Sequence, residues 1–233
     1  MHPLDNVIWQ ALTTRQAEFA QTCDQACRFK PEVASLAGLR RTTAQAYESL
    51  AGLATPGELI YLSLEKPYEP QPGWDFVAGG PMPQMVYEKG AANFGTPSSG
   101  ASASEIIELG PADIPDMMEL TELTQPGPFS KRTHELGTYL GIRCEGKLVA
   151  MAGQRMKVPG YTEVSAVCTH PDHLGQGYAR ILMAEIMRRI FDCGEIPFLH
   201  VREENQRAIS LYEKLGFRRR VTSQLTVIRK RLQ

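Results

Sequence analysis

The hydrophobic pattern in the second half of this chain changes from strand-like to helix-like and back. Short apolar runs predict four strands, at residues 106–109, 138–144, 147–156 and 162–169. The pairs Glu145-Gly146 and Pro159-Gly160 separate the last three runs, and both are turn formers. These three strands are therefore expected to form an antiparallel meander.

Helical spacing surrounds and follows this meander. Apolar residues that recur three and four positions apart predict helices at residues 114–123, from Gln176 to about Ile190, and at residues 205–214. Two more apolar runs predict short strands at residues 197–201 and 225–230. The turn-forming residues 124–130, T-Q-P-G-P-F-S, predict a loop between the first of these helices and the meander.

The first half has a weaker pattern and no chemical motif. Helices are expected at residues 11–29 and 42–53, a strand at residues 58–64, and short strands at residues 76–77 and 84–87. Within the first helix, Cys23 and Cys27 would lie one turn apart as small buried residues.

Residues 93–104, N-F-G-T-P-S-S-G-A-S-A-S, are almost all small or turn-forming, a composition typical of a flexible connector. They divide the chain into a smaller α/β region at residues 1–92 and a second domain at residues 105–233.

The composition is that of a globular protein. Its 233 residues, of which 42% are hydrophobic, are enough to bury a core. The 25 basic and 26 acidic residues nearly balance, so no nucleic-acid or membrane-surface partner is expected. The chain shows neither a secretion signal nor an apolar run long enough for a membrane span, which predicts a cytoplasmic protein. The five cysteines form no C-x-x-C pair, so no metal site is expected.

Residues 169–179, T-H-P-D-H-L-G-Q-G-Y-A, place Gly175 and Gly177 directly before a predicted helix. A helix N-terminus offers unpaired backbone N–H groups and the positive end of the helix dipole, which together attract phosphate without a cationic side chain. No lysine followed by serine or threonine comes after the glycines, and the strand before them belongs to a meander. Both facts argue against nucleotide and dinucleotide loops. Simple turn chemistry is the alternative explanation of the two glycines.

The order strand, helix, meander, glycine loop, helix, strand, helix, strand resembles the GNAT superfamily of acyl-CoA N-acyltransferases over residues 105–231. The resemblance implies an α/β fold with a mostly antiparallel sheet and splayed strands, and acetyl-CoA as co-substrate. It also implies that backbone amides of the loop hold the coenzyme A pyrophosphate, at Leu174, Gly175, Gln176, Gly177, Tyr178 and Ala179. Leu174 departs from the Arg or Gln that the family has at its position.

Residues 200–217, H-V-R-E-E-N-Q-R-A-I-S-L-Y-E-K-L-G-F, are similar to the second cofactor segment of the family. By resemblance, Asn205 contacts the pantetheine arm, and Tyr212 is the general acid for the departing thiolate. An aromatic core residue is the alternative for Tyr212. A free backbone N–H at a splayed or bulged strand polarises the carbonyl, with Val167, Cys168 and Thr169 as the candidates. Because Cys168 lies in an apolar strand with no paired base, it is expected to be a buried structural thiol.

The acceptor side is less clearly marked. Glu163, at the start of the strand that leads to the loop, is the first choice for the general base, and a solvated surface charge is the alternative. His134 and His170 are other candidates for the base. Phe129, His134 and Glu163 are expected to contact the acceptor, because residues 124–134 resemble the acceptor-binding loop.

The expected activity is direct transfer of an acetyl group from acetyl-CoA to a primary amine. The resemblance is closest to the glycine-N-acyltransferase-like relatives, and residues 1–92 would then be a degenerate second copy, a cover for the acceptor pocket, or a homodimer surface. The rival hypothesis is a non-catalytic module that binds coenzyme A or an amine. The acceptor is a small molecule or a peptide, and no acidic cluster in the loop marks a polyamine.

Overall fold

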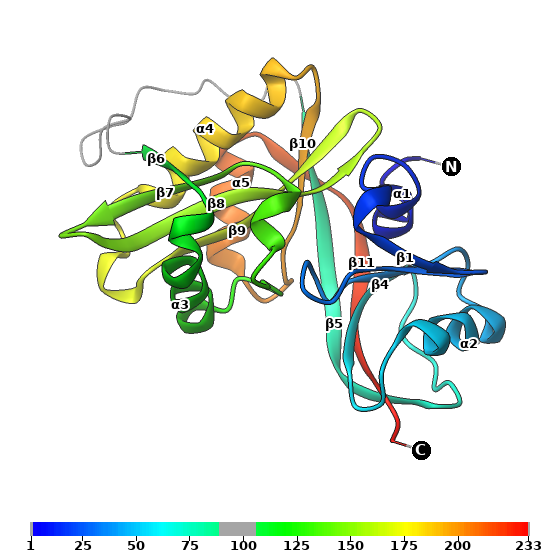
Figure 1. Ribbon diagram of the computed structural model, residues 1–233. Coiled ribbons are helices and arrows are strands. Elements are labelled where there is room, and N and C mark those ends of the chain that lie inside the picture. Colours follow the sequence, from blue (N-terminus) through cyan, green and yellow to red (C-terminus); the bar gives the residue numbers. More distant parts are fainter. Residues whose placement is uncertain (1, 89–105, 233) are drawn as a thin grey trace.

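A computed structural model describes residues 2–88 and 106–232, and its largest element is an eight-stranded sheet (Figure 1). Its strands in chain order are β4 (Leu59–Leu64), β5 (Trp74–Tyr87), β6 (Ile106–Leu109), β7 (Tyr139–Cys144), β8 (Lys147–Val158), β9 (Tyr161–Thr169), β10 (Ile196–His200) and β11 (Phe217–Lys230). In space they follow the order β4-β11-β5-β10-β9-β8-β7-β6. Only β9 and β10 pair in parallel among these described strands. This mixed, mostly antiparallel sheet confirms the expected α/β fold class.

Helices cover both faces of the sheet. On β7, Leu140 and Ile142 pack with α4 (Tyr178–Asp192), while Tyr139 faces the opposite way and packs with α3 (Ile114–Thr124). α5 (Gln206–Lys214) lies against β11. Short 3-10 turns complete this half, η3 (Pro111–Asp113), η4 (Thr133–Leu136) and η5 (Pro171–His173). No helix within the described ranges is long and apolar enough to span a membrane.

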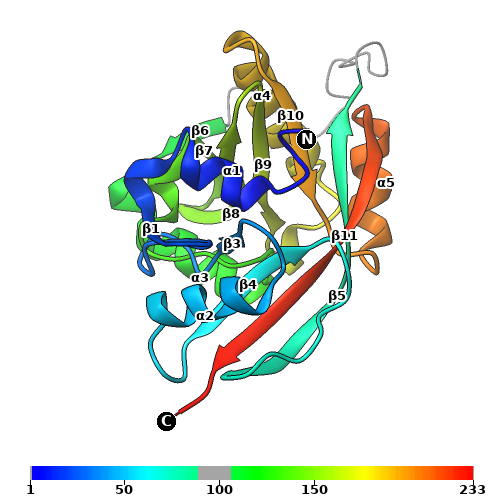
Figure 2. The same ribbon diagram turned by 90° about the vertical axis from the view of Figure 1, so that its right-hand side faces the viewer.

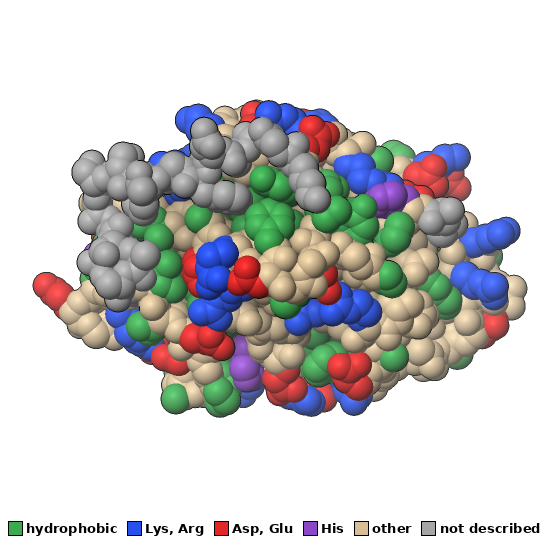
Figure 3. All heavy atoms as spheres, turned by 90° about the horizontal axis from the view of Figure 1, so that it is seen from above, with side chains coloured by type: hydrophobic (Ala, Val, Ile, Leu, Met, Phe, Trp, Pro, Cys, Tyr) green, Lys and Arg blue, Asp and Glu red, His purple; other side chains and the backbone are tan. Residues whose placement is uncertain are grey.

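The predicted elements of the second half are confirmed, with ends shifted by at most two residues except in the last strand. That strand, β11, begins at Phe217 rather than residue 225, so the arginines 218–220 lie within it. On the face seen in Figure 3, basic side chains lie beside acidic ones rather than in a patch of one sign. On α4, for example, Arg188 pairs with Glu185 and Asp192.

The first half contains α1 (Val7–Thr13), the 3-10 turn η1 (Ala17–Phe19), α2 (Ala44–Leu53) and a small sheet of β1 (Ala20–Cys23), β2 (Ala26–Phe29) and β3 (Ala37–Leu39). The expected helix at residues 11–29 is wrong, because a hairpin occupies most of it. Its turn is Asp24-Gln25, with Asp24 in the left-handed region at φ 42°. Burial of Cys27 and Phe29 beneath α1 outweighs the helix propensity of the local sequence. The expected helix at residues 42–53 is confirmed as α2, which Thr43 caps.

β5 joins the two halves of the chain. It is one strand of 14 residues, not two short ones, and it lies between β10 and β11 (Figure 2). Pro81 and Pro83 interrupted the sequence pattern, yet their carbonyl oxygens accept hydrogen bonds from Glu203 and Val201. Residues on both sides of the predicted linker therefore build the same sheet. The linker itself, residues 93–104, lies outside the described residues.

We expect residues 105–233 produced alone to be insoluble or unfolded, because β11 would lose both of its neighbours, β4 and β5, and β10 would lose β5. Expression of this fragment with and without residues 1–92, followed by circular dichroism of the soluble fraction, tests this. The pair of fragments should form a folded complex. Cooperative unfolding of the second fragment by itself would contradict the prediction.

Candidate functional site

The strands β9 and β10 part after three paired residues. Ile196, Pro197 and Phe198 pair with Tyr161, Thr162 and Glu163, and the ladder then stops. Beyond this point β9 stays with β8, while β10 stays with β5. The two strands therefore form a V whose vertex is at Glu163.

A cleft of about 780 Å³ occupies the opening of this V. β9 contributes Val164 to Thr169 to its lining. The segment after β10 contributes Val201 and Asn205, and α5 contributes Tyr212. The loop after α3 contributes residues 125–130, including Phe129. The first half of the chain contributes Ile8, Ser35, Leu36, Tyr61 and Ser63. Both halves therefore enclose the cleft.

β9 carries a bulge on the lining of the cleft. Its ladder with β8 pairs Ser165 with Gly153 and then Cys168 with Met151, so Ala166 and Val167 lie opposite Ala152 alone. Ala166 adopts φ 52°, an uncommon conformation for a residue with a Cβ atom. A bulge of this kind leaves one residue without regular ladder bonds. This irregularity at residues 166–167 overlaps at Val167 with the segment 167–169, the candidates for the free N–H in the sequence analysis.

The glycine loop leads from β9 into α4. Gly175 has φ 84°, and Gly177, the N-cap of α4, has φ 81°. A Cβ atom at either position would meet nothing within 4 Å, so backbone conformation rather than crowding requires glycine. The first intrahelical bond of α4 runs from Ile181 N–H to the Gly177 carbonyl, which leaves the amides of the first turn for a ligand.

The side chains of the loop differ in their surroundings. Leu174 is exposed. Earlier in the same segment, His170 closes the turn η5, because its Nδ1 accepts the N–H of Asp172. Tyr178 packs against the core, with its hydroxyl 3.5 Å from the Cys144 thiol. Tyr178 therefore offers its backbone rather than its side chain to a ligand.

α5 brings Asn205 and Tyr212 to the cleft. Asn205 caps the helix, since its Oδ1 accepts the Ala208 N–H at 3.1 Å, and the cap leaves its side-chain amide free to donate. The Tyr212 ring is buried against Phe217. Its hydroxyl has no hydrogen-bond partner among the described residues, and it is not one of their buried unpartnered atoms, so it is open to the cleft. Burial, with a smaller contribution from the neighbouring Cys168, raises the pKa of Tyr212 to about 12.

Cys168 is a buried thiol whose pKa burial raises to about 11, despite hydrogen bonds with Thr124 and the Met151 backbone. It is therefore protonated at neutral pH and is a poor nucleophile.

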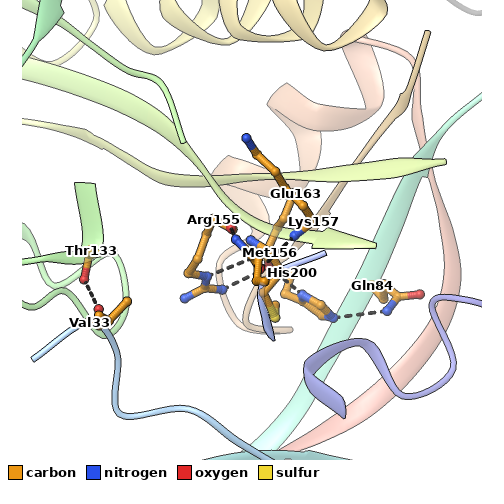
Figure 4. A network of polar contacts seen from close by, with 9 residues as sticks. Val33, Gln84, Thr133, Arg155, Met156, Lys157, Glu163 and His200 are labelled. Carbon is orange, nitrogen blue, oxygen red and sulfur yellow. Dashed lines mark hydrogen bonds and ion pairs between the residues drawn. The ribbon is translucent and has the colours of Figure 1, made fainter. Parts of the chain in front are cut away.

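Glu163 lies at the vertex and is fully buried (Figure 4). Arg155 binds it through two hydrogen bonds, Nε to Oε2 at 2.8 Å and Nη2 to Oε1 at 3.0 Å. The Met156 N–H and His200 Nδ1 approach the same carboxylate at 3.3 and 2.8 Å. Burial alone would raise its pKa, but Arg155 and His200 outweigh this effect and lower the pKa of Glu163 to about 2.

This placement argues against Glu163 as a general base. A carboxylate with a pKa near 2 holds a proton weakly at neutral pH, and Glu163 does not line the cleft. His134 does not line it either, and its Nδ1 lies 3.1 Å from the Lys131 carbonyl oxygen. His170 serves the turn η5. Of the expected acceptor residues, Phe129 does line the cleft, with its ring against Tyr139.

The vertex also contains residues that the sequence pattern did not single out. His200 donates from Nδ1 to Glu163, and its Nε2 lies 3.2 Å from the amide nitrogen of Gln84. Arg220 donates to the Gln84 oxygen and pairs with Asp5. For His200, the sequence signals were its position in a short apolar run and its place at the start of the segment 200–217, which resembles the second cofactor segment. Within residues 2–88 and 106–232, no group of three or more His, Cys, Asp or Glu residues is placed to bind a metal ion.

The solved structure of a GNAT-family protein from Novosphingobium aromaticivorans resembles the whole chain. It is 34% identical, with a TM-score of 0.88, and the match covers 100% of both chains. The chain belongs to the GNAT family of acetyltransferases. A family described as "FR47-like protein" matches residues 139–226 of this GNAT chain, which include the bulge, the glycine loop and α5.

Two curated relatives match parts of the GNAT chain. The N-alpha-acetyltransferase RimI of Mycobacterium tuberculosis is 36% identical over 101 residues, 40% of this chain and 63% of its own length. The L-amino acid N-acyltransferase MnaT of Escherichia coli is 33% identical over 58 residues, 24% of this chain and 34% of its own length. The GNAT chain thus matches less than two thirds of the length of either relative.

Replacement of Glu163 by Gln should reduce the acid sensitivity of this GNAT protein. The folded pKa of about 2 lies below the usual 4.5. The charged group therefore stabilises the fold above pH 4.5, and this stabilisation is lost as the pH falls toward 2. The shift corresponds to about 3 kcal/mol. Urea unfolding at about pH 7 and pH 3 should show a larger loss for the wild type than for the variant. Equal losses in both proteins would overturn this assignment.

Proposed function

We propose that this protein transfers an acetyl group from acetyl-CoA directly to a primary amine. The proposal is supported by family membership and by the names of the two curated relatives, an N-acetyltransferase and an N-acyltransferase. The observation that carries it is the order of features along β9, which leads from the vertex through the bulge to the glycine loop. We keep the glycine-N-acyltransferase-like subgroup as part of the proposal, because a first half without a glycine loop precedes the half with the loop.

The amides at the start of α4 would hold the pyrophosphate of coenzyme A. They combine unpaired N–H groups with the positive end of a 15-residue helix. The pantetheine arm would then lie in the opening of the V, along Val167 to Thr169, as an added strand does. The free amide of Asn205 would donate to this arm from the opposite side.

Transfer requires a polarised carbonyl and a proton for the leaving sulfur. A backbone N–H released at the 166–167 bulge would donate to the thioester oxygen as negative charge develops on it. The amine nitrogen forms the new C–N bond, the C–S bond breaks, and Tyr212 donates its proton to the sulfur. The amine gives up its own proton to water in the cleft, and solvent returns a proton to Tyr212.

The surroundings of Tyr212 favour this donation. A phenol is a weaker acid than a thiol in water, so the transfer would ordinarily be unfavourable. Beside Tyr212, however, the Cys168 thiol has a pKa raised to about 11, close to the value of about 12 for Tyr212 itself. The burial that raises the pKa of Cys168 would also make a thiolate that leaves beside Tyr212 more basic than it is in water, which reduces the unfavourable difference between the two acids.

Glu163 takes a positioning role in this proposal. Its carboxylate holds Arg155 and His200 at the vertex. The acceptor would react in its neutral amine form, without proton transfer to a carboxylate whose pKa is near 2. The rival non-catalytic module explains the glycine loop equally well. It gives no reason, however, for a Tyr212 hydroxyl that lies on the cleft with no partner in the described part of the chain.

The variant Tyr212→Phe should lower kcat by about 100-fold or more, while coenzyme A affinity stays within about twofold, because general acids contribute roughly that factor. Free-thiol release with a panel of amines and calorimetric titration of coenzyme A measure the two quantities. Tyr161→Phe is the control, since its hydroxyl bonds to His2 and does not line the cleft. Unchanged turnover in the Tyr212 variant would remove the acid role. Absence of turnover in the wild type with every amine would favour the rival.

The variant Gly177→Val should weaken coenzyme A binding at least tenfold, because valine disfavours φ 81° and would reshape the N-terminus of α4. Gly194→Val is a matched control, with φ 73° and equally open space at the other end of the helix. Both variants should lose similar stability, and only the first should lose affinity in a coenzyme A titration. Equal affinity in the two variants would contradict the proposed cradle.

A further inference from the structure

The charged residues that line the cleft differ in exposure. Glu122 is exposed, and the Arg202 side chain is 65% exposed, with Glu204 as its partner at 3.7 Å. The Arg155 side chain is only 12% exposed and lies at the vertex. Arg155 is therefore the charged lining residue that a ligand in the interior of the cleft would meet.

Arg155 has hydrogen-bonding capacity to spare. Glu163 takes its Nε and one N–H of Nη2, along one edge of the guanidinium. Nη1 has no partner among the described residues. Nη1 is also not buried. Among the described residues, Tyr139 Oη is the one side-chain polar atom that is both buried and without a partner. The remaining pair of donors, Nη1 and the second N–H of Nη2, forms a fork that matches a carboxylate.

The position of Arg155 separates this fork from the phosphates of coenzyme A. Its partner Glu163 lies six residues before Thr169, where β9 ends, and a strand of that length spans roughly 20 Å. The bulge at Ala166, where the acyl carbonyl would lie, is only about 10 Å along β9 from Glu163. The fork therefore lies on the acceptor side, nearer to the acyl-transfer point than to the phosphates.

We propose that Arg155 binds a carboxylate of the acceptor, so that the acceptor is a small amine that carries its carboxylate close to the amino group, as a free amino acid does. This inference rests on the proposed acetyl transfer. Glu163 fixes the guanidinium plane and neutralises most of its charge, so Arg155 acts through directed hydrogen bonds. A peptide N-terminus has an amide in place of this carboxylate and would leave the fork unpaired.

The test compares the common L-amino acids with their carboxamides as acceptors for the full-length protein and acetyl-CoA. Rates are expressed per neutral amine, because amidation lowers the pKa of the amine. The best amino acid should exceed its carboxamide in kcat/KM by about tenfold to hundredfold, the range for a hydrogen bond to a charged group. Carboxamides or peptides accepted as well as the free acids would overturn the inference and leave acetyl transfer intact. Failure of every amine would overturn the proposed function itself.

Two variants separate recognition from structural damage. Arg155→Gln should bring the ratio of acid to carboxamide close to one, with carboxamide turnover reduced much less than acid turnover. Glu163→Gln breaks the same buried pair but leaves the charge of Arg155 without its partner. In this variant the ratio of acid to carboxamide should therefore equal or exceed that of the wild type. A ratio unchanged by Arg155→Gln, or abolished equally by both variants, would contradict a direct contact. If Arg155→Gln does not fold, Arg155→Lys should still lower the ratio, because lysine lacks the fork.

Discussion

The parallel pairing of β9 and β10 ends at Glu163 and Phe198, and the proposed site depends on that point. Two neighbouring strands of a sheet lie only about 4.8 Å apart, too close for a ligand between them. Once the ladder stops, each strand follows its other neighbour, and the gap widens into the cleft. The bulge and Tyr212 line this opening, and the glycine loop follows the end of β9.

The vertex combines two opposing electrostatic effects. Withdrawal of the Glu163 carboxylate from water is costly, and Arg155, His200 and the Met156 N–H together offset that cost. The same bonds fix three strands, β8, β9 and β10, in register where backbone pairing between β9 and β10 runs out. Polar side chains thus replace the missing backbone ladder, and they leave one edge of a guanidinium directed at the cleft.

Local patterns predicted the elements on which the proposed cofactor site is built. The glycine loop, the spacing of α4 and the segment with Asn205 and Tyr212 are each readable within about 15 residues of sequence. Arg155 was not predictable in this way, because its role depends on a partner across a ladder that bulges shift. His200 meets Glu163 only through the parallel register. The same limit explains the wrong helix at residues 11–29, since the cluster that buries Cys27 and Phe29 contains, besides α1, the distant residues Met156, Val158 and Phe198.

The insertion of β5 between β10 and β11 has a consequence for how the chain folds. Gln84 on β5 and His200 on β10 bond to each other across 116 residues of sequence. Contacts this distant in the chain form slowly, since a large loop must close before they contribute. During synthesis, both edges of β5 stay unpaired until β10 and β11 have emerged, which leaves them open to pairing with other chains. The strand that supports one side of the cleft is thus made early and paired late.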